Sequence, residues 1–184
     1  MSVGSIRKSV IVLVLGFIAV FVQGTLLRGS FPSMVVPDLV CILVVFLSFY
    51  EPGLLGAFLA FLVGLQFDLA SGVLLGPRAG SSVAVFGFLS SLSQRIFVES
   101  GTAMMFAVFI STIVNFAVYM ILVVEFRHTQ EVIVSDFFRL SVLGEATLSA
   151  LITPLIFLVL RRLFSARPTS GGSANLSGLS RSAR

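Results

Sequence analysis

Long apolar runs separated by short polar gaps constrain the fold of this chain more than any other feature. Of its 184 residues, 57% are hydrophobic and 11% are charged, whereas a soluble domain carries about a quarter charged residues. A chain with so little charge has too little polar surface to face water on every side. We therefore predict an integral membrane protein, with lipid around most of its surface.

Apolar runs of about 20 residues can cross the ~30 Å hydrocarbon core of a bilayer as helices. Three runs have this length, and three more are shorter or interrupted. We predict an all-α bundle of six transmembrane helices, at residues 9–27, 34–50, 53–67, 79–94, 102–124 and 140–160. Residues 1–167 would form one compact membrane domain, and the Ser- and Gly-rich residues 168–184 would form a flexible basic tail.

The positions of arginine and lysine predict the orientation in the membrane. With six spans, both ends of the domain lie on the same side. That side would hold Arg7, Lys8, Arg95, Arg161, Arg162, Arg167, Arg181 and Arg184, and the other side Arg28, Arg78, Arg127 and Arg139. Because basic residues gather on the cytoplasmic side of membrane proteins, we expect both termini in the cytoplasm.

Small residues recur at every fourth position in three segments, and such rows mark faces where membrane helices pack closely. The rows are Gly56, Ala60 and Gly64, then Ala103, Ala107, Ser111 and Asn115, and a more polar row of Ser141, Glu145, Ser149 and Thr153. Asp68, Gly72 and Gly76 prolong the first row at the same spacing. We expect the first two rows to serve for helix packing.

Two carboxylates within or beside the apolar runs call for partners. A charged Glu145 inside a span costs about 2–3 kcal/mol, so we expect either a cation beside it or a protonated side chain. The candidate cations are Arg78, Arg127 and Arg139. Asp68 either caps the outer end of its span or binds a partner protein, and Arg78 is the nearest cation that could neutralise it.

Residue types that support catalysis or metal binding are scarce. Cys41 is the only cysteine and lies in an apolar run, which excludes a disulfide or a thiolate metal cluster and indicates a packing role. His128 is the only histidine, so the His-Glu-x-x-His zinc motif cannot form. The basic residues are scattered without interleaved aromatic residues, which argues against nucleic acid. We predict no enzymatic activity, no cofactor and no metal ion.

Short segments near the ends of the predicted spans carry a resemblance to a known family. Pro37-Asp38-Leu39 opens the second span and Tyr50-x-Pro52 closes it. Gly64-Leu65-Gln66-Phe67-Asp68-Leu69-Ala70-Ser71-Gly72 is followed by Leu75-Gly76, and Thr153-Pro154-Leu155-Ile156-Phe157 leads into Arg161-Arg162. Over about residues 7–164, these segments and their order resemble the bacterial rod shape-determining protein MreD family.

The resemblance implies a non-catalytic scaffold of the cell-elongation complex in the bacterial inner membrane. It also implies that the protein acts together with MreC, and that it lies close to a RodA-type glycosyltransferase, the elongation transpeptidase and MreB filaments. On this interpretation, contacts with partner proteins and membrane lipid would involve Asp38, Asp68, Gly72, Gly76, Arg78 and Glu145. No catalytic residue is implied.

A second hypothesis is a substrate-binding subunit of an energy-coupling-factor vitamin transporter, which is also a compact bundle of about six spans. Such a subunit should have an Ala-x-x-x-Ala row in its first span and a polar, aromatic pocket at its outer face. The first span here offers Gly16 and Ala19, which are not four residues apart, and the chain has no Trp and two Tyr. The scaffold is therefore favoured, although a shared fold would not separate the two hypotheses.

Overall fold

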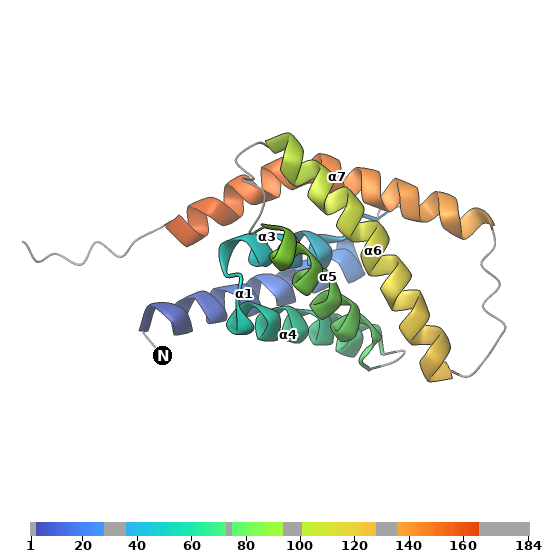
Figure 1. Ribbon diagram of the computed structural model, residues 1–184, viewed down its shortest axis with the longest axis horizontal. Coiled ribbons are helices and arrows are strands. Elements are labelled where there is room, and N and C mark those ends of the chain that lie inside the picture. The colour runs from blue at the N-terminus through green and yellow to red at the C-terminus, as the bar shows by residue number, and fades with distance from the viewer. Residues whose placement is uncertain (1–2, 28–35, 73–74, 94–100, 128–135, 166–184) are drawn as a thin grey trace, which may run out of the picture.

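The computed structural model describes residues 3–27, 36–72, 75–93, 101–127 and 136–165, and this part of the chain is helical (Figure 1). The helices are α1 (Val3–Phe21), η1 (Val22–Leu27), α3 (Leu39–Tyr50), α4 (Leu54–Ser71), α5 (Pro77–Ser93), α6 (Gly101–Arg127) and α7 (Asp136–Ser165). Over the described ranges there are six α-helices and no strands, which confirms the predicted all-α fold. The predicted tail, residues 168–184, lies outside these ranges.

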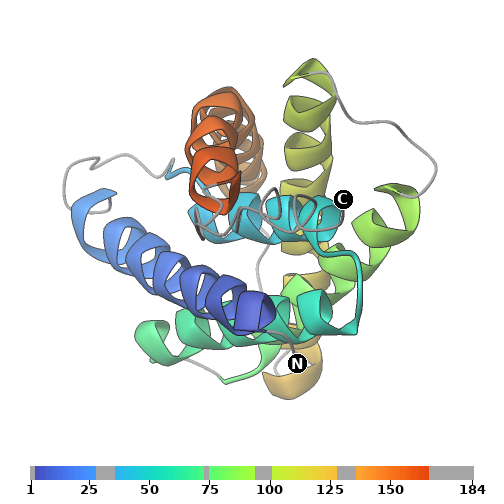
Figure 2. The ribbon, with the colours of Figure 1, turned by 90° about the vertical axis from the view of Figure 1, so that its left-hand side faces the viewer.

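Helix α3 lies at the centre of the bundle, with the other α-helices around it (Figure 2). Every residue from Val40 to Ser48 is buried, as expected of a helix that is apolar on all sides. Its 12 residues make it about 18 Å long, which is too short to cross a ~30 Å hydrocarbon core. The predicted span at residues 34–50 therefore corresponds to a short, enclosed helix.

Four helical segments are long and apolar enough to cross a membrane: Ile6–Thr25, Leu54–Ser71, Thr102–Val123 and Val142–Phe164. Their outer faces expose large apolar side chains, including Phe17 at 65%, Phe106 at 70% and Leu155 at 68%. A soluble monomer rarely exposes apolar surface on this scale. These faces fit a lipid environment, as the composition predicts.

Helices α4 and α5 form a hairpin that packs through the first row of small residues. A Cβ atom added to Gly64 would lie 2.7 Å from the Cα of Ala79, and one added to Gly56 would lie 2.7 Å from the Phe86 ring. Ala60, between these glycines, is completely buried. The absence of a side chain at Gly64 allows the backbones of α4 and α5 to approach this closely.

The start of α1 and the end of α7 lie at the same end of the bundle, which we call the α1–α7 end (Figure 1). The Lys8 Nζ atom lies 3.0 Å from the Glu51 carboxylate and 5.9 Å from the centre of the Tyr50 ring. The Tyr50 ring in turn lies 5.2 Å from the ring of Phe164. Side chains of α1, α3 and α7 are thus in contact at this end.

Candidate functional site: a buried polar junction

Asp38, at the start of α3, carries the most buried carboxylate in the described part of the chain, and the residue is 1% exposed. Its Oδ1 atom accepts a hydrogen bond from the Cys41 N–H at 2.9 Å, which caps the helix. Its own backbone N–H donates to the Ser149 hydroxyl of α7 at 2.8 Å. Asp38 therefore begins α3 and also joins it to α7.

Arg78 of α5 supplies the opposite charge for Asp38. Its Nη2 atom donates to Oδ2 of Asp38, in an ion pair whose side chains are 11% and 1% exposed. The guanidinium also lies 4.8 Å from the centre of the Phe67 ring of α4, a distance that suits a cation–π contact. An isolated charge within a membrane is costly, and pairing reduces this cost for both side chains.

Asn115 brings α6 into the same cluster. Its side-chain N–H donates to Oδ2 of Asp38 at 3.3 Å, and the residue is 3% exposed. Because Asp38 also bonds to Arg78 of α5 and Ser149 of α7, four helices meet at one aspartate. We call Asp38, Arg78, Asn115 and Ser149 the polar junction. Two of its atoms, Nε of Arg78 and Oδ1 of Asn115, are buried without a hydrogen-bond partner.

Asp68 lies at the turn between α4 and α5 and is 3% exposed. Its carboxylate accepts hydrogen bonds from the backbone N–H groups of Gly76, Arg78 and Ala79 at 3.0, 3.1 and 3.0 Å. These groups open α5 and have no partner within their own helix, so the carboxylate caps the helix and complements its dipole. Asp68 thereby holds Arg78 in position for its contact with Asp38.

The turn after α4 differs from the sequence expectations in two respects. The guanidinium of Arg78 pairs with Asp38 and not with Asp68, which receives only the Arg78 backbone N–H. Helix α4 also continues to residue 71, beyond its predicted end at 67, because the Asp68 carboxylate is satisfied inside the protein and does not need water. Gly72 and Gly76 make the turn with φ angles of 64° and 115°, which favour glycine.

The polar row of α7 contributes Ser149 to the junction. Ser149 and Thr153 are completely buried, and Glu145 is partly buried. Glu145 interacts electrostatically with Arg78, which is one of its three predicted cationic partners. The remaining side chains of these predictions, Ser141, Arg127 and Arg139, lie outside the described part of the structure.

The row of small residues on α6 lies toward the interior. Ala103 and Ala107 are partly buried, and Ser111 and Asn115 are buried. Ala107 packs against the apolar core, whereas Asn115 enters the polar junction. The row therefore combines close packing with one specific polar contact.

The groups of the junction are arranged to bind one another. Cys41, next to Asp38, is buried, and its Sγ atom lies 3.9 Å from the Thr112 hydroxyl. Within the described ranges, no three His, Cys, Asp or Glu side chains are placed to hold a metal ion. What this arrangement can do is hold α3, α5, α6 and α7 in one relative position.

Sequence reasoning identified Asp38, Arg78 and Asn115 as separate candidates and missed that they meet. A signal for the ion pair was available, because Asp38 begins the predicted span 34–50 and Arg78 precedes the predicted span 79–94, both on the side opposite the termini in the predicted six-span order. Opposite charges at the same depth in a membrane tend to pair. The bond from Ser149 to the backbone of α3 had no such signal, since a serine in a packing row carries no information on its partner.

These features define a class of protein, a helical membrane protein whose central helix is joined to its neighbours by buried polar contacts. Comparison with known families goes further: the model of the rod shape-determining protein MreD family matches residues 4–163. The chain belongs to this family, which confirms the resemblance in its sequence and implies a role in determining rod shape. No curated protein sequence and no solved structure gives a significant match.

Proposed function

We propose that the protein is a non-catalytic scaffold of the cell-elongation complex in the bacterial inner membrane, where it works with MreC. Family membership supports the shape-determining role. The polar junction carries the finer proposal, because an aspartate bonded to three other helices fixes their relative positions. A scaffold needs fixed geometry, since partner helices recognise a membrane protein through the close fit of its outer faces.

The residues predicted to contact partners lie mostly inside the protein, and we infer that they act indirectly. Asp38 and Asp68 are buried, Gly76, Arg78 and Glu145 are partly buried, and Gly72 is exposed. Buried groups at these positions determine how the helices are placed. The contacts themselves would be made by the exposed apolar faces of α1, α6 and α7.

The proposed orientation places the α1–α7 end in the cytoplasm. Lys8, Arg161 and Arg162 lie at this end, and basic residues favour the cytoplasmic side. In this orientation the α1–α7 end would face MreB filaments. The lipid-facing sides of the helices would contact the RodA-type glycosyltransferase and the elongation transpeptidase.

The proposal is tested by tagging the chain, cross-linking it in its host and identifying the proteins that purify with it. We expect MreC and the wall synthases to accompany the native chain. The Arg78→Met variant should lose these partners and fail to maintain rod shape, because the buried Asp38 is left without its counter-charge. The matched control is Glu51→Gln, which removes a partly exposed ion pair. Rod-shaped cells with normal partner recovery in Arg78→Met would contradict the proposal.

One observation keeps the transporter subunit as a second candidate. A cavity of about 290 Å³ lies between η1, α4 and α6, and its lining includes Gln23, Phe67 and Tyr119. The Oε1 atom of Gln23 is buried without a hydrogen-bond partner, a feature that calls for an explanation such as a polar ligand or water. Recovery of a paired ATPase and its membrane coupling subunit, with a small molecule released on denaturation, would favour transport over the scaffold.

A further inference from the structure

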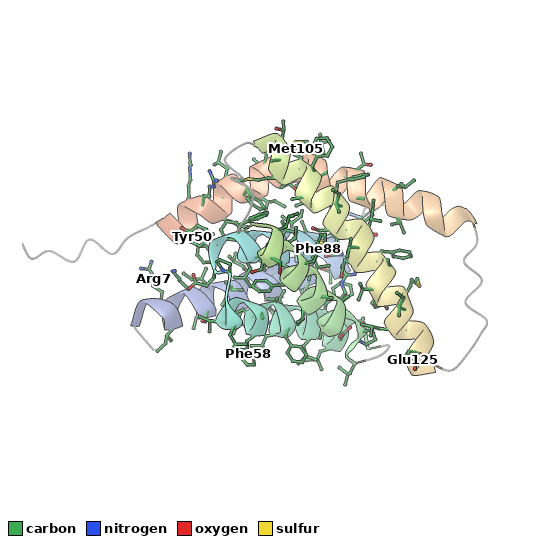
Figure 3. The ribbon with its side chains drawn as sticks, in the orientation of Figure 1. Arg7, Tyr50, Phe58, Phe88, Met105 and Glu125 are labelled. Carbon is green, nitrogen blue, oxygen red and sulfur yellow. The ribbon has the colours of Figure 1, made fainter. Side chains whose placement is uncertain are left out.

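Basic residues of the first and the last described helices lie at the same end of the bundle, the α1–α7 end. The four are Arg7 and Lys8 of α1 and Arg161 and Arg162 of α7. The ring of Tyr50 links the two helices, because it lies 5.9 Å from Lys8 Nζ of α1 and 5.2 Å from the ring of Phe164 of α7. Figure 3 shows Arg7 and Tyr50 at this end of the bundle. Residues far apart in the sequence thus form one basic surface.

The positive charge at this end exceeds the negative charge of the described residues there. The Glu51 carboxylate lies 3.0 Å from Lys8 Nζ, and this pair accounts for one of the four cations. Arg7, Arg161 and Arg162 are exposed, and no ion pair is seen for them within the described ranges. Three arginines are therefore available to an anion from outside the protein.

Helical spacing places the two arginines of α7 on adjoining faces. Arg161 shares the face of Phe157 and Phe164, whose rings both pack against α3. Arg162 shares the face of Leu158, whose side chain is 50% exposed. Arg161 therefore lies beside the side of α7 that packs on α3, and Arg162 lies beside a side with exposed apolar residues.

Exposed apolar side chains continue from these charges along both helices. Val10 and Val14 on α1 are 53% and 52% exposed, and Leu158 and Val159 on α7 are 50% exposed. A soluble phosphate compound would contact the arginines alone. A phospholipid would contact the arginines through its headgroup and these apolar side chains through its acyl chains, and so it uses the whole surface.

We propose that the α1–α7 end binds the headgroup of an anionic phospholipid, and binds most strongly one that carries two phosphates. A guanidinium binds phosphate oxygens through paired N–H groups, and arginines from two helices would each bind one of two linked phosphates. Helices α1 and α7 each pack against α3, so the lipid would join them across its end. This inference is independent of the elongation-complex proposal, because it rests on charge and position alone.

The test is native mass spectrometry of the full chain in uncharged lipid nanodiscs, to which diphosphatidylglycerol is added. The variant is Arg161→Gln with Arg162→Gln. The matched control is Arg127→Gln with Arg139→Gln, which removes the same charge at the far ends of α6 and α7. We expect lipid affinity to fall about fivefold for each arginine, and roughly thirtyfold for the pair. The control should bind like the native chain. Arg161→Lys with Arg162→Lys keeps the charge but loses the paired N–H groups, so it should bind more weakly than the native chain and more strongly than the glutamine pair.

Equal binding by the glutamine variant and the native chain would overturn the proposal, as would an equal loss in the control. Displacement of the lipid by inorganic pyrophosphate at a similar concentration would also overturn it, because the site would then select a soluble anion. Circular dichroism checks that each variant is folded. If the variant with both glutamines does not fold, Arg7→Gln replaces it and Arg127→Gln becomes its control. Each of these variants removes one positive charge, the first from α1 and the second from α6.

Discussion

Two ion pairs in the described ranges lie in contrasting surroundings, and burial decides what each contributes. The side chains of Asp38 and Arg78 are 1% and 11% exposed, whereas those of Glu51 and Lys8 are 33% and 43% exposed. Water screens an exposed pair, so such pairs typically contribute between about 0 and 1 kcal/mol. A buried pair contributes little net energy when intact, but its disruption leaves an uncompensated charge.

We therefore predict that Arg78→Met destabilises the protein by about 3–5 kcal/mol. Adding Asp38→Asn should restore most of this loss, because the second change removes the uncompensated charge while asparagine still caps α3. The measurement is the free energy of unfolding in mild detergent for both single variants and the double variant. Additive losses from the two changes would show that the pair does not act as a unit.

The partly exposed pair of Lys8 and Glu51 gives a second prediction. Glu51→Gln should lower the free energy of unfolding by less than about 1 kcal/mol, measured in the same detergent. High salt should reduce even this difference, since exposed charges are screened. A loss as large as that of Arg78→Met would show that the α1–α7 end depends on this pair.

Among the helices, the contact between α4 and α5 is set by backbone proximity. Gly64→Ala should destabilise the protein by about 1–3 kcal/mol, because the new Cβ atom would lie 2.7 Å from Ala79 Cα and 2.8 Å from the Arg78 carbonyl oxygen. The matched control is Gly87→Ala in α5, where no atom lies within 4 Å of the added Cβ. Alanine favours a helix over glycine, so the control should be neutral or stabilising. Thermal unfolding of the two variants measures the difference.

For the molecule as a whole, the enclosed α3 and the shared α1–α7 end predict a pattern of chemical labelling. Cys41 is 2% exposed and should not react with a membrane-impermeant maleimide in intact or permeabilised cells. The native chain therefore gives no background labelling, and cysteines can be introduced one at a time. Arg162→Cys, at the α1–α7 end, should react only after the inner membrane is permeabilised. Glu125→Cys, near the C-terminal end of α6, should already react when only the outer membrane is permeabilised. Labelling of both from the same side would contradict the proposed orientation.

Composition and the lengths of the apolar runs were sufficient to predict an all-helical membrane protein. They succeed because apolar content and helix length are local properties, which the lipid environment selects segment by segment. Short motifs around Asp38, Asp68 and residues 153–162 likewise indicated the family, because they can be recognised without knowledge of how the helices pack.

Contacts between distant segments could not be predicted in this way. Asp38 meets Arg78, Asn115 and Ser149, which follow it by 40, 77 and 111 residues, and a local pattern does not state which helices will be neighbours. Residues 34–50 were predicted to span the membrane because an enclosed helix and a lipid-facing helix are equally apolar, and a local pattern does not distinguish them. Packing of the other five α-helices around α3 brought the polar groups to one place, because that arrangement pairs the buried charges while the apolar faces remain in lipid.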